Sequence, residues 1–312
     1  MIVMETIEQL KKIELENSTP DDVRKILYES PLPAIKSVIT KGTYIIRARK
    51  GDGYTKRSQM TYCPVEFCKS LQRATLNGQT MFYGVISDDQ SHLENARAIS
   101  CAECSKLTRA GLESIGREKF TLSYWEVVKP ISVVSFITDS TFPKVQNNKL
   151  LSDLRNTFNN MSLTSQEKNL IRFISDEFSK IVTDNREYLI TATISSDIIN
   201  KTKTDGIIFP SVQLGGQGGL NIALSPNAVN SKLRFIRTLG QTLYKNKDKS
   251  LIRIEKYTER NSKTHIKYQF SNQILLDELN IKDVNELPLI EFLCLMLFYK
   301  LSLIHISEPT RH

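Results

Sequence analysis

Apolar residues along the chain follow a helical spacing at the N-terminus and a strand-like spacing further on. Ile7, Leu10 and Ile13 recur at intervals of three, and Ser18-Thr-Pro-Asp-Asp offers a cap with a proline in the first turn of a second helix. From Gly42 the pattern shortens to runs typical of strands, at 43–49, 81–86, 120–127 and 131–136, with a helix expected between them at 91–108. The sequence therefore predicts a helical segment over 1–41, followed by a strand-rich region.

A second helical region separates these strands from a later set. Leu170, Phe173, Ile174, Phe178 and Ile181 form an apolar face within a predicted helical insert at about 149–201, which we expect to cover one side of a sheet. Strands are predicted again at 206–213, 220–224, 233–243, 250–257 and 264–270. This order favours a single α+β domain over 42–275 with the insert as an addition to it, followed by a helical segment at 276–300. The apolar run at 287–299 is too short to cross a bilayer and predicts a buried helix.

Charge and cysteine content narrow the function classes. The 312 residues carry a net charge of +8, but the lysines and arginines are scattered, so nucleic acid is an unlikely partner. The N-terminus lacks the basic flank and apolar run of a signal peptide. Five cysteines, an odd number, do not suggest a disulfide framework. We therefore expect a cytoplasmic protein with no membrane partner.

The sequence of the last dozen residues suggests that they do not belong to the natural protein. Leu301-Ser-Leu-Ile-His-Ile-Ser-Glu-Pro-Thr-Arg311 resembles the conceptual translation of a transposon-end sequencing adapter. We expect residues 301–312 to be an artefact that replaces the natural C-terminus, so that 276–300 is a truncated segment.

Charged residues at three places are candidates for a binding or catalytic site. Arg47 and Arg49 alternate with Ile46, so both are predicted on one face of their strand, where they meet either solvent or an anion. Glu103 lies on the apolar stripe of its predicted helix, where a carboxylate needs a partner or a task. Glu94, half a turn around the same helix, is the second candidate, on a more polar side.

Other motifs give weaker signals. Two pairs of cysteines, Cys63 with Cys68 and Cys101 with Cys104, could suggest a zinc site. A C-x2-C pair within a helix is poor chelate geometry, however, so we interpret these cysteines as buried thiols. The same interpretation applies to Cys294. The glycine run 215–219 lacks the Lys-Ser/Thr ending of a P-loop and predicts a hairpin connection. The four histidines form no cluster, and no metal site is predicted.

An ordered set of short motifs resembles the RES-domain family, whose fold is similar to that of ADP-ribosyltransferases. The matching pieces, from about residue 42 to 245, are Ile46-Arg47-Ala-Arg49, Gln72-Arg73-Ala74, Met81-Phe-Tyr83-Gly, the helix bearing Glu103, and Asp205-Gly-Ile-Ile-Phe-Pro-Ser211-Val. The resemblance implies an α+β fold with an ADP-ribosyltransferase-like, mixed or antiparallel β core.

The same resemblance implies roles for individual residues. Glu103 would be the catalytic carboxylate, with Arg47 and Ser211 as the other catalytic residues. The ribose or phosphates of NAD would be contacted by Arg47, Arg49 and Arg73. Tyr83 would line the nicotinamide pocket, and Ser211 would orient the site. Compact family members have a shorter spacing between the tyrosine and the glutamate, which would favour Glu94.

The implied activity is cleavage of NAD, which is a substrate here, with no cofactor expected. The enzyme would be an NAD glycohydrolase or phosphorylase of the toxin type, and an antitoxin or inhibitor protein would be its candidate partner. A protein ADP-ribosyltransferase would use the same site with another acceptor. The remaining alternative is a non-catalytic binding protein that retains the fold.

Overall fold

The computed structural model describes residues 2–30, 32–87, 93–105, 107, 114–145, 148–211, 219–246, 249–258 and 269–270. The predicted segments 276–300 and 301–312, and with them the run 287–299, lie outside these residues.

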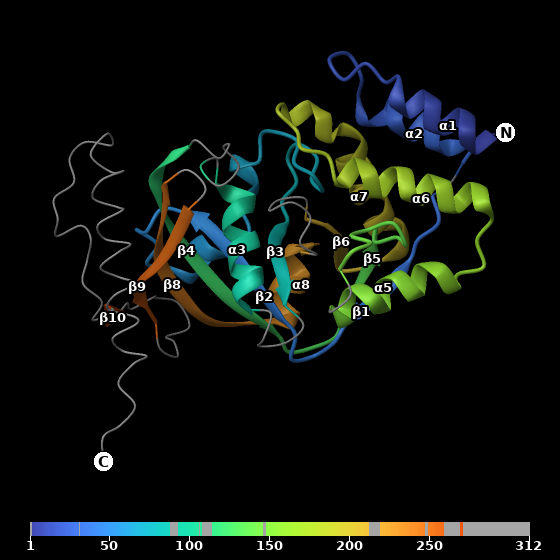
Figure 1. Ribbon diagram of the computed structural model, residues 1–312. Coiled ribbons are helices and arrows are strands. Elements are labelled where there is room, and N and C mark those ends of the chain that lie inside the picture. Colours follow the sequence, from blue (N-terminus) through green and yellow to red (C-terminus); the bar gives the residue numbers. More distant parts are fainter. Residues whose placement is uncertain are drawn as a thin grey trace.

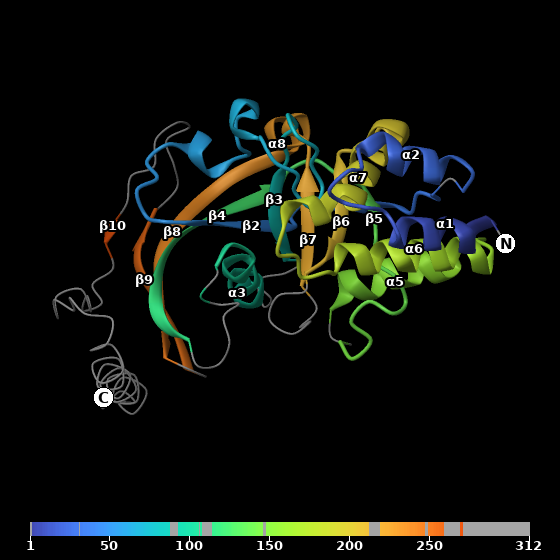
Figure 2. The same cartoon turned by 90° about the horizontal axis from the view of Figure 1, so that it is seen from above.

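One mixed sheet runs through the described part of the chain (Figure 1). Its strand order is β1-β5-β6-β7-β3-β2-β4-β8-β9-β10, and every neighbouring pair is antiparallel except β5 and β6. In Figure 2 the long strands β4 and β8 curve around helix α3. The bounds are β1 (Lys36–Ile39), β2 (Tyr44–Lys50), β3 (Phe82–Ser87), β4 (Ile115–Val127), β5 (Ile131–Ser135), β6 (Gly206–Pro210), β7 (Leu220–Leu224), β8 (Leu233–Asn246), β9 (Lys249–Tyr257) and β10 (Gln269–Phe270).

Helices pack on both faces of this sheet, and local sequence signals fix several of their ends. Thr164 and Glu167 form a reciprocal capping box at the start of α6, and Pro20 and Pro226 occupy the first turns of α2 and α8, where a missing backbone N–H costs nothing. The bounds are α1 (Ile2–Lys11), α2 (Pro20–Tyr28), α3 (Leu93–Cys104), α5 (Lys149–Asn160), α6 (Ser165–Phe178), α7 (Leu189–Thr202) and α8 (Pro226–Lys232), with 3-10 turns at Arg57–Met60, Val65–Phe67 and Asn185–Tyr188.

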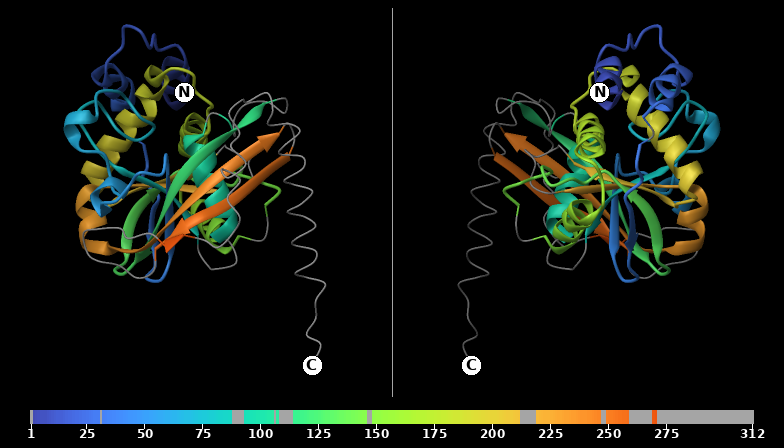
Figure 3. Two further views of the ribbon diagram at one scale, coloured as in Figure 1. Left: turned by 90° about the vertical axis from the view of Figure 1, so that its left-hand side faces the viewer. Right: turned by 90° about the vertical axis from the view of Figure 1, so that its right-hand side faces the viewer.

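Strand alternation divides the core between the two faces. On one face, α1, α2, α6 and α7 cover a cluster that includes Phe136, Phe178 and Phe209, and Figure 3 shows the two N-terminal helices beside α7. On the opposite face, α5 and α8 pack on a cluster centred on Trp125, whose ring contacts Phe82 edge-on. Helix α3 covers a third cluster beside Ile46 and Val85.

The structure confirms the mixed α+β class and the helical insert, and it corrects several details. The prediction that residues 1–41 are wholly helical is wrong, because residues 36–39 form edge strand β1 beyond Pro33. Ile181 is 72% exposed and not part of the apolar face, since α6 ends at Phe178. The predicted strand 206–213 ends at Pro210, so that Ser211 follows it. Of the predicted strand 264–270, only residues 269–270 are described.

Candidate functional site

Strands β2 and β3 separate after a short paired stretch, and this fork in the sheet lies beside a pocket. Their ladder ends at Ile46↔Val85, after which β2 continues along β4 while β3 continues along β7. The same register would place Ala48 opposite Tyr83. Instead, the Ala48 N–H donates to Ser100 Oγ at 2.7 Å, and the Tyr83 carbonyl accepts from Arg47 Nη1 at 2.7 Å. Side chains thus satisfy backbone groups that the fork separates, beside a cavity of about 450 Å³.

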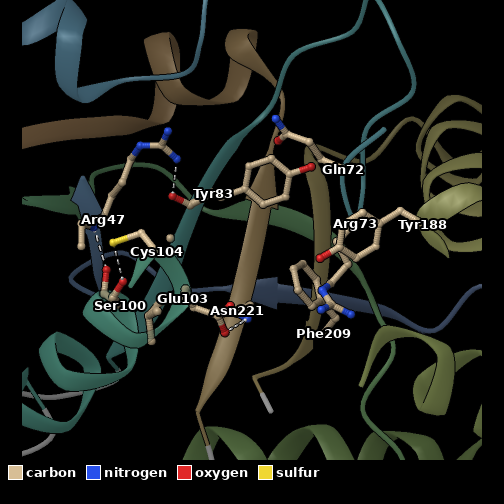
Figure 4. Close-up of a pocket in the computed structure, with 13 residues that line it drawn as sticks. Arg47, Gln72, Arg73, Tyr83, Ser100, Glu103, Cys104, Tyr188, Phe209 and Asn221 are labelled. Atoms are coloured by element: carbon tan, nitrogen blue, oxygen red, sulfur yellow. Dashed lines mark hydrogen bonds between the residues drawn. The ribbon is translucent and has the colours of Figure 1, made fainter. Parts of the chain in front are cut away.

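Glu103 lines this cavity and accepts hydrogen bonds from two donors, of which Figure 4 shows Asn221. Ser211 Oγ donates to Glu103 Oε1 at 2.5 Å, and Asn221 Nδ2 donates to the same oxygen at 2.7 Å. Ser211 is 1% exposed and is not among the residues that line the cavity, whereas Asn221 lines it. Because charge-assisted hydrogen bonds to a carboxylate are short and directional, this pair fixes the orientation of Glu103.

Three separate elements bring these groups together. Ser211 follows β6, Asn221 lies in the neighbouring β7, and Glu103 is near the end of α3, which packs on β2 and β3. Gly219 permits the close approach, because a Cβ there would lie 2.6 Å from Ile99 Cδ1 of α3 and 3.2 Å from Ser211 Cβ. The Ser211 N–H donates to the Gly219 carbonyl at 2.8 Å, which anchors the serine backbone.

Arg47 reaches the same cavity from the opposite face of the sheet. By alternation it shares its face with Ile45, and its guanidinium stands 5.3 Å from the Phe82 ring centre. Figure 4 shows its side chain directed to the Tyr83 carbonyl, away from Glu103. Burial, and to a smaller extent the charge of Arg49, lower the pKa of Arg47 to about 10. Its Nε is buried with no hydrogen-bond partner, and no carboxylate pairs with it in the described chain. Arg47 is therefore a partly desolvated cation suited to an anion.

Tyr83 presents its ring to the cavity while its hydroxyl is anchored elsewhere. The Ala74 N–H donates to Tyr83 Oη at 3.2 Å, and Thr75 Oγ1 shares a short hydrogen bond with it. Burial raises the pKa of Tyr83 to about 12, so the phenol stays neutral near pH 7. The ring is thus a fixed aromatic wall.

Arg73 also lines the cavity, but its donors point to the end of α6. Nη1 donates to the Phe178 carbonyl at 2.5 Å and Nη2 to the Lys180 carbonyl at 2.9 Å, and the guanidinium stacks 4.9 Å from the Tyr188 ring centre. A cation at a helix C-terminus is favoured by the helix dipole. The contacts described for Arg73 are therefore structural ones, on the rim of the cavity.

Arg49, predicted as a further NAD contact, lies outside the cavity lining. Its Nη1 donates to the Gln59 carbonyl, and its guanidinium stacks 5.1 Å from the Tyr54 ring centre. The shared face predicted for Arg47 and Arg49 is confirmed, but the segment 51–60 covers Arg49. Asp205, the first residue of the Ser211 motif, is structural, since it accepts from the Ser132 N–H and from Lys232 Nζ.

Some residues of the cavity were not singled out from the sequence. Asn221 could have been, because it is a lone amide in the buried strand Leu220–Leu224, the same signal that identified Ser211. Tyr188 and Phe209 carry no such signal, since aromatic residues are common in cores. Glu94 lies in the first turn of α3, and its side chain is outside the described part of the structure.

The four described cysteines are Cys63 and Cys68, in one segment, and Cys101 and Cys104, in α3. Among the described residues, no group of three or more His, Cys, Asp or Glu side chains could hold a metal ion. Cys68 and Cys101 are buried, as the interpretation of buried thiols predicts, whereas Cys63 and Cys104 are partly exposed. Cys104 lines the cavity beside Glu103, and burial raises its pKa to about 11. Cys294 lies outside the described residues. The predicted hairpin is confirmed, since β6 and β7 pair as antiparallel neighbours, although 212–218 is not described.

Comparisons with known proteins give no relative for this chain. No family model matches it, and neither curated proteins nor solved structures include a significant match. No helix in the described part of the chain combines the length and the apolar character needed to cross a bilayer.

Proposed function

We propose that this protein cleaves the bond between nicotinamide and ribose in NAD, and that its forked sheet is an ADP-ribosyltransferase-like core of the RES type. The observation that carries the proposal is the carboxylate of Glu103, which faces the cavity and is oriented by Ser211 and Asn221. The resemblance of the motifs to the RES family supplies the identity of the substrate.

The residue types suit the chemistry of this bond. Breaking the C1′–N bond sends its electron pair to nicotinamide and leaves positive charge on the ribose C1′ and ring oxygen. A fixed carboxylate stabilises that charge, since preorganised groups need no reorientation during the reaction. The Tyr83 ring offers a stacking surface for nicotinamide, and Arg47 offers an anion contact for the phosphates. Water or phosphate then bonds to C1′ from the opposite face and gives up a proton.

Glu103→Gln tests the proposal directly. The purified protein is incubated with NAD, with and without inorganic phosphate, and nicotinamide is measured by chromatography. Because the amide keeps the size but loses the charge, we expect release to fall by roughly 100-fold or more. Dependence of the rate on phosphate would separate phosphorolysis from hydrolysis.

A matched control uses the same substitution at an exposed position. Glu66 lies in the 3-10 turn Val65–Phe67, outside the cavity, so Glu66→Gln should release nicotinamide at the wild-type rate. Equal rates for the wild type and Glu103→Gln would contradict the proposed catalytic role. NAD binding without release would favour the non-catalytic alternative, and release only on addition of a protein acceptor would favour ADP-ribosyl transfer.

A further inference from the structure

Strand β1 forms one end of the described sheet and directs backbone groups outward. The Ser135 N–H of β5 donates to the Ile35 carbonyl at 2.8 Å, and the register continues as Lys36↔Val134. Because hydrogen-bonded and non-hydrogen-bonded pairs alternate in an antiparallel ladder, Ser37 and Ile39 bond to β5, whereas Lys36 and Val38 point their N–H and C=O groups away from it. Among the described residues, no strand pairs with this outer edge.

A groove follows the same edge. Its volume is about 370 Å³, and its walls are β1, the following Thr40, and one side of α5, including Leu150, Asp153 and Leu154. Ser37 Oγ is buried and has no hydrogen-bond partner. Val38 is 57% exposed on the opposite face of the strand. An unsatisfied hydroxyl, outward backbone groups and an exposed valine therefore occur on four consecutive residues.

We propose that the outer edge of β1 binds an extended segment of a partner protein as an additional strand of the sheet. Main-chain groups of Lys36 and Val38 would exchange up to four hydrogen bonds with it, and side chains alternating along the segment would enter the groove or face solvent. A donor or acceptor on the groove side satisfies Ser37 Oγ.

The charges at this edge select an acidic segment. Lys36, whose Nζ donates to the Thr202 carbonyl at 3.4 Å, and Lys149 border the groove, and Asp153 is the one acid among the described residues that line it. Opposite charges on directly paired strands are favourable, while like charges are not. The favoured occupant thus alternates acidic residues beside Lys36 with small apolar residues over Ile39 and Leu154.

A second copy of this chain fits the groove less well than a single strand. Symmetric pairing of two β1 strands, about 4.8 Å apart, would place both α5 helices on the same face of the joint sheet. Packed helices need about 8–10 Å between their axes. Since α5 already forms one wall of the groove, a second α5 would compete with the first for this space.

Val38→Pro tests the proposal at the backbone. Proline removes an N–H that points outward, so it breaks no bond to β5, and edge strands tolerate proline in this orientation. The probe is a fluorescein-labelled peptide of eight alternating glutamate and valine residues, followed by fluorescence anisotropy with the full chain. We expect binding to the wild type, a loss of about tenfold or more in Val38→Pro, and little change in the matched control Val38→Ala.

Two further measurements make the result specific. In the wild type, the peptide should slow hydrogen exchange at the Lys36 and Val38 amides. A control peptide of the same length, with lysine in place of each glutamate, should bind at least fivefold more weakly. Equal melting temperatures for the three proteins would show that Val38→Pro is folded. Unchanged affinity in a folded Val38→Pro, no binding of either peptide, or a dimer that Val38→Pro dissociates would each overturn the proposal.

Discussion

Replacing Arg47 with methionine should leave the protein as stable or make it more stable, while removing the proposed contact with the phosphates of NAD. The lowering of the pKa of Arg47 to about 10, mainly by burial, corresponds to roughly 3 kcal/mol against the charged form, since one pKa unit is about 1.4 kcal/mol. Methionine has a similar length and carries no charge into this site.

The substitution also removes favourable contacts. The hydrogen bond to the Tyr83 carbonyl contributes roughly 1 kcal/mol, and the contact with the Phe82 ring about 1 kcal/mol more. The expected result is therefore a free energy of unfolding between unchanged and about 2 kcal/mol higher. If the main role of Arg47 were to stabilise the separation of β2 and β3, the same substitution would lower the free energy of unfolding.

Urea unfolding followed by tryptophan fluorescence measures this change, because Trp125 is the chain's one tryptophan and is fully buried. Arg49→Met is the matched control on the same strand face. It removes a hydrogen bond to the Gln59 carbonyl and a contact with the Tyr54 ring, and should cost up to about 2 kcal/mol. Adding NAD should raise the melting temperature of the wild type and not of Arg47→Met. A loss of more than about 1 kcal/mol in Arg47→Met would refute the reasoning.

Three further predictions concern the same part of the fold. Asn221→Leu should lower nicotinamide release by about 10- to 100-fold with little change in KM, since it removes a donor that orients Glu103; a change confined to KM would contradict this role. Gly206→Ala should lower the free energy of unfolding in urea by about 2–4 kcal/mol or prevent folding, because its Cβ would lie 2.0 Å from the Ala223 carbonyl oxygen. The control Gly53→Ala should leave the free energy of unfolding nearly unchanged, since the space around Gly53 is open. Cys101 and Cys104 should react slowly with iodoacetamide at pH 8 in the native protein and fully in urea, because burial raises their pKa values to about 12 and 11; rapid labelling of the native protein would contradict this.

Periodicity predicted most of the secondary structure, because the buried positions of these elements follow simple repeats. The apolar stripe of α6 and the alternation around Arg47 were both readable. Edge strand β1 was missed because only one of its four residues is buried and the strand shows little hydrophobic alternation. Helix α8 was missed because Pro226-Asn-Ala-Val-Asn-Ser-Lys232 is short and polar.

The members of the site were partly predictable, but their contacts were not. Glu103 and Ser211 are 108 residues apart, and the hydrogen bond between them depends on how α3 crosses the sheet. No periodicity encodes that crossing. The position of Arg73 could not be predicted either, since its partners are carbonyl groups freed at the end of α6, more than 100 residues away. Loss of backbone pairing at the fork is likewise a tertiary property.

The fork resolves an apparent conflict within the candidate site. Arg47 and Glu103 lie on opposite faces of the sheet, and in an unbroken ladder the strands would separate them completely. Because β2 and β3 part after Ile46↔Val85, both side chains line one cavity. A ligand with an anionic group at Arg47 and its reacting carbon at Glu103 would therefore pass between the two strands, beside the Tyr83 ring. In the proposed reaction the pyrophosphate of NAD, one ribose away from the reacting C1′, would be that anionic group, so the break in the sheet, more than any single residue, makes the proposed chemistry feasible.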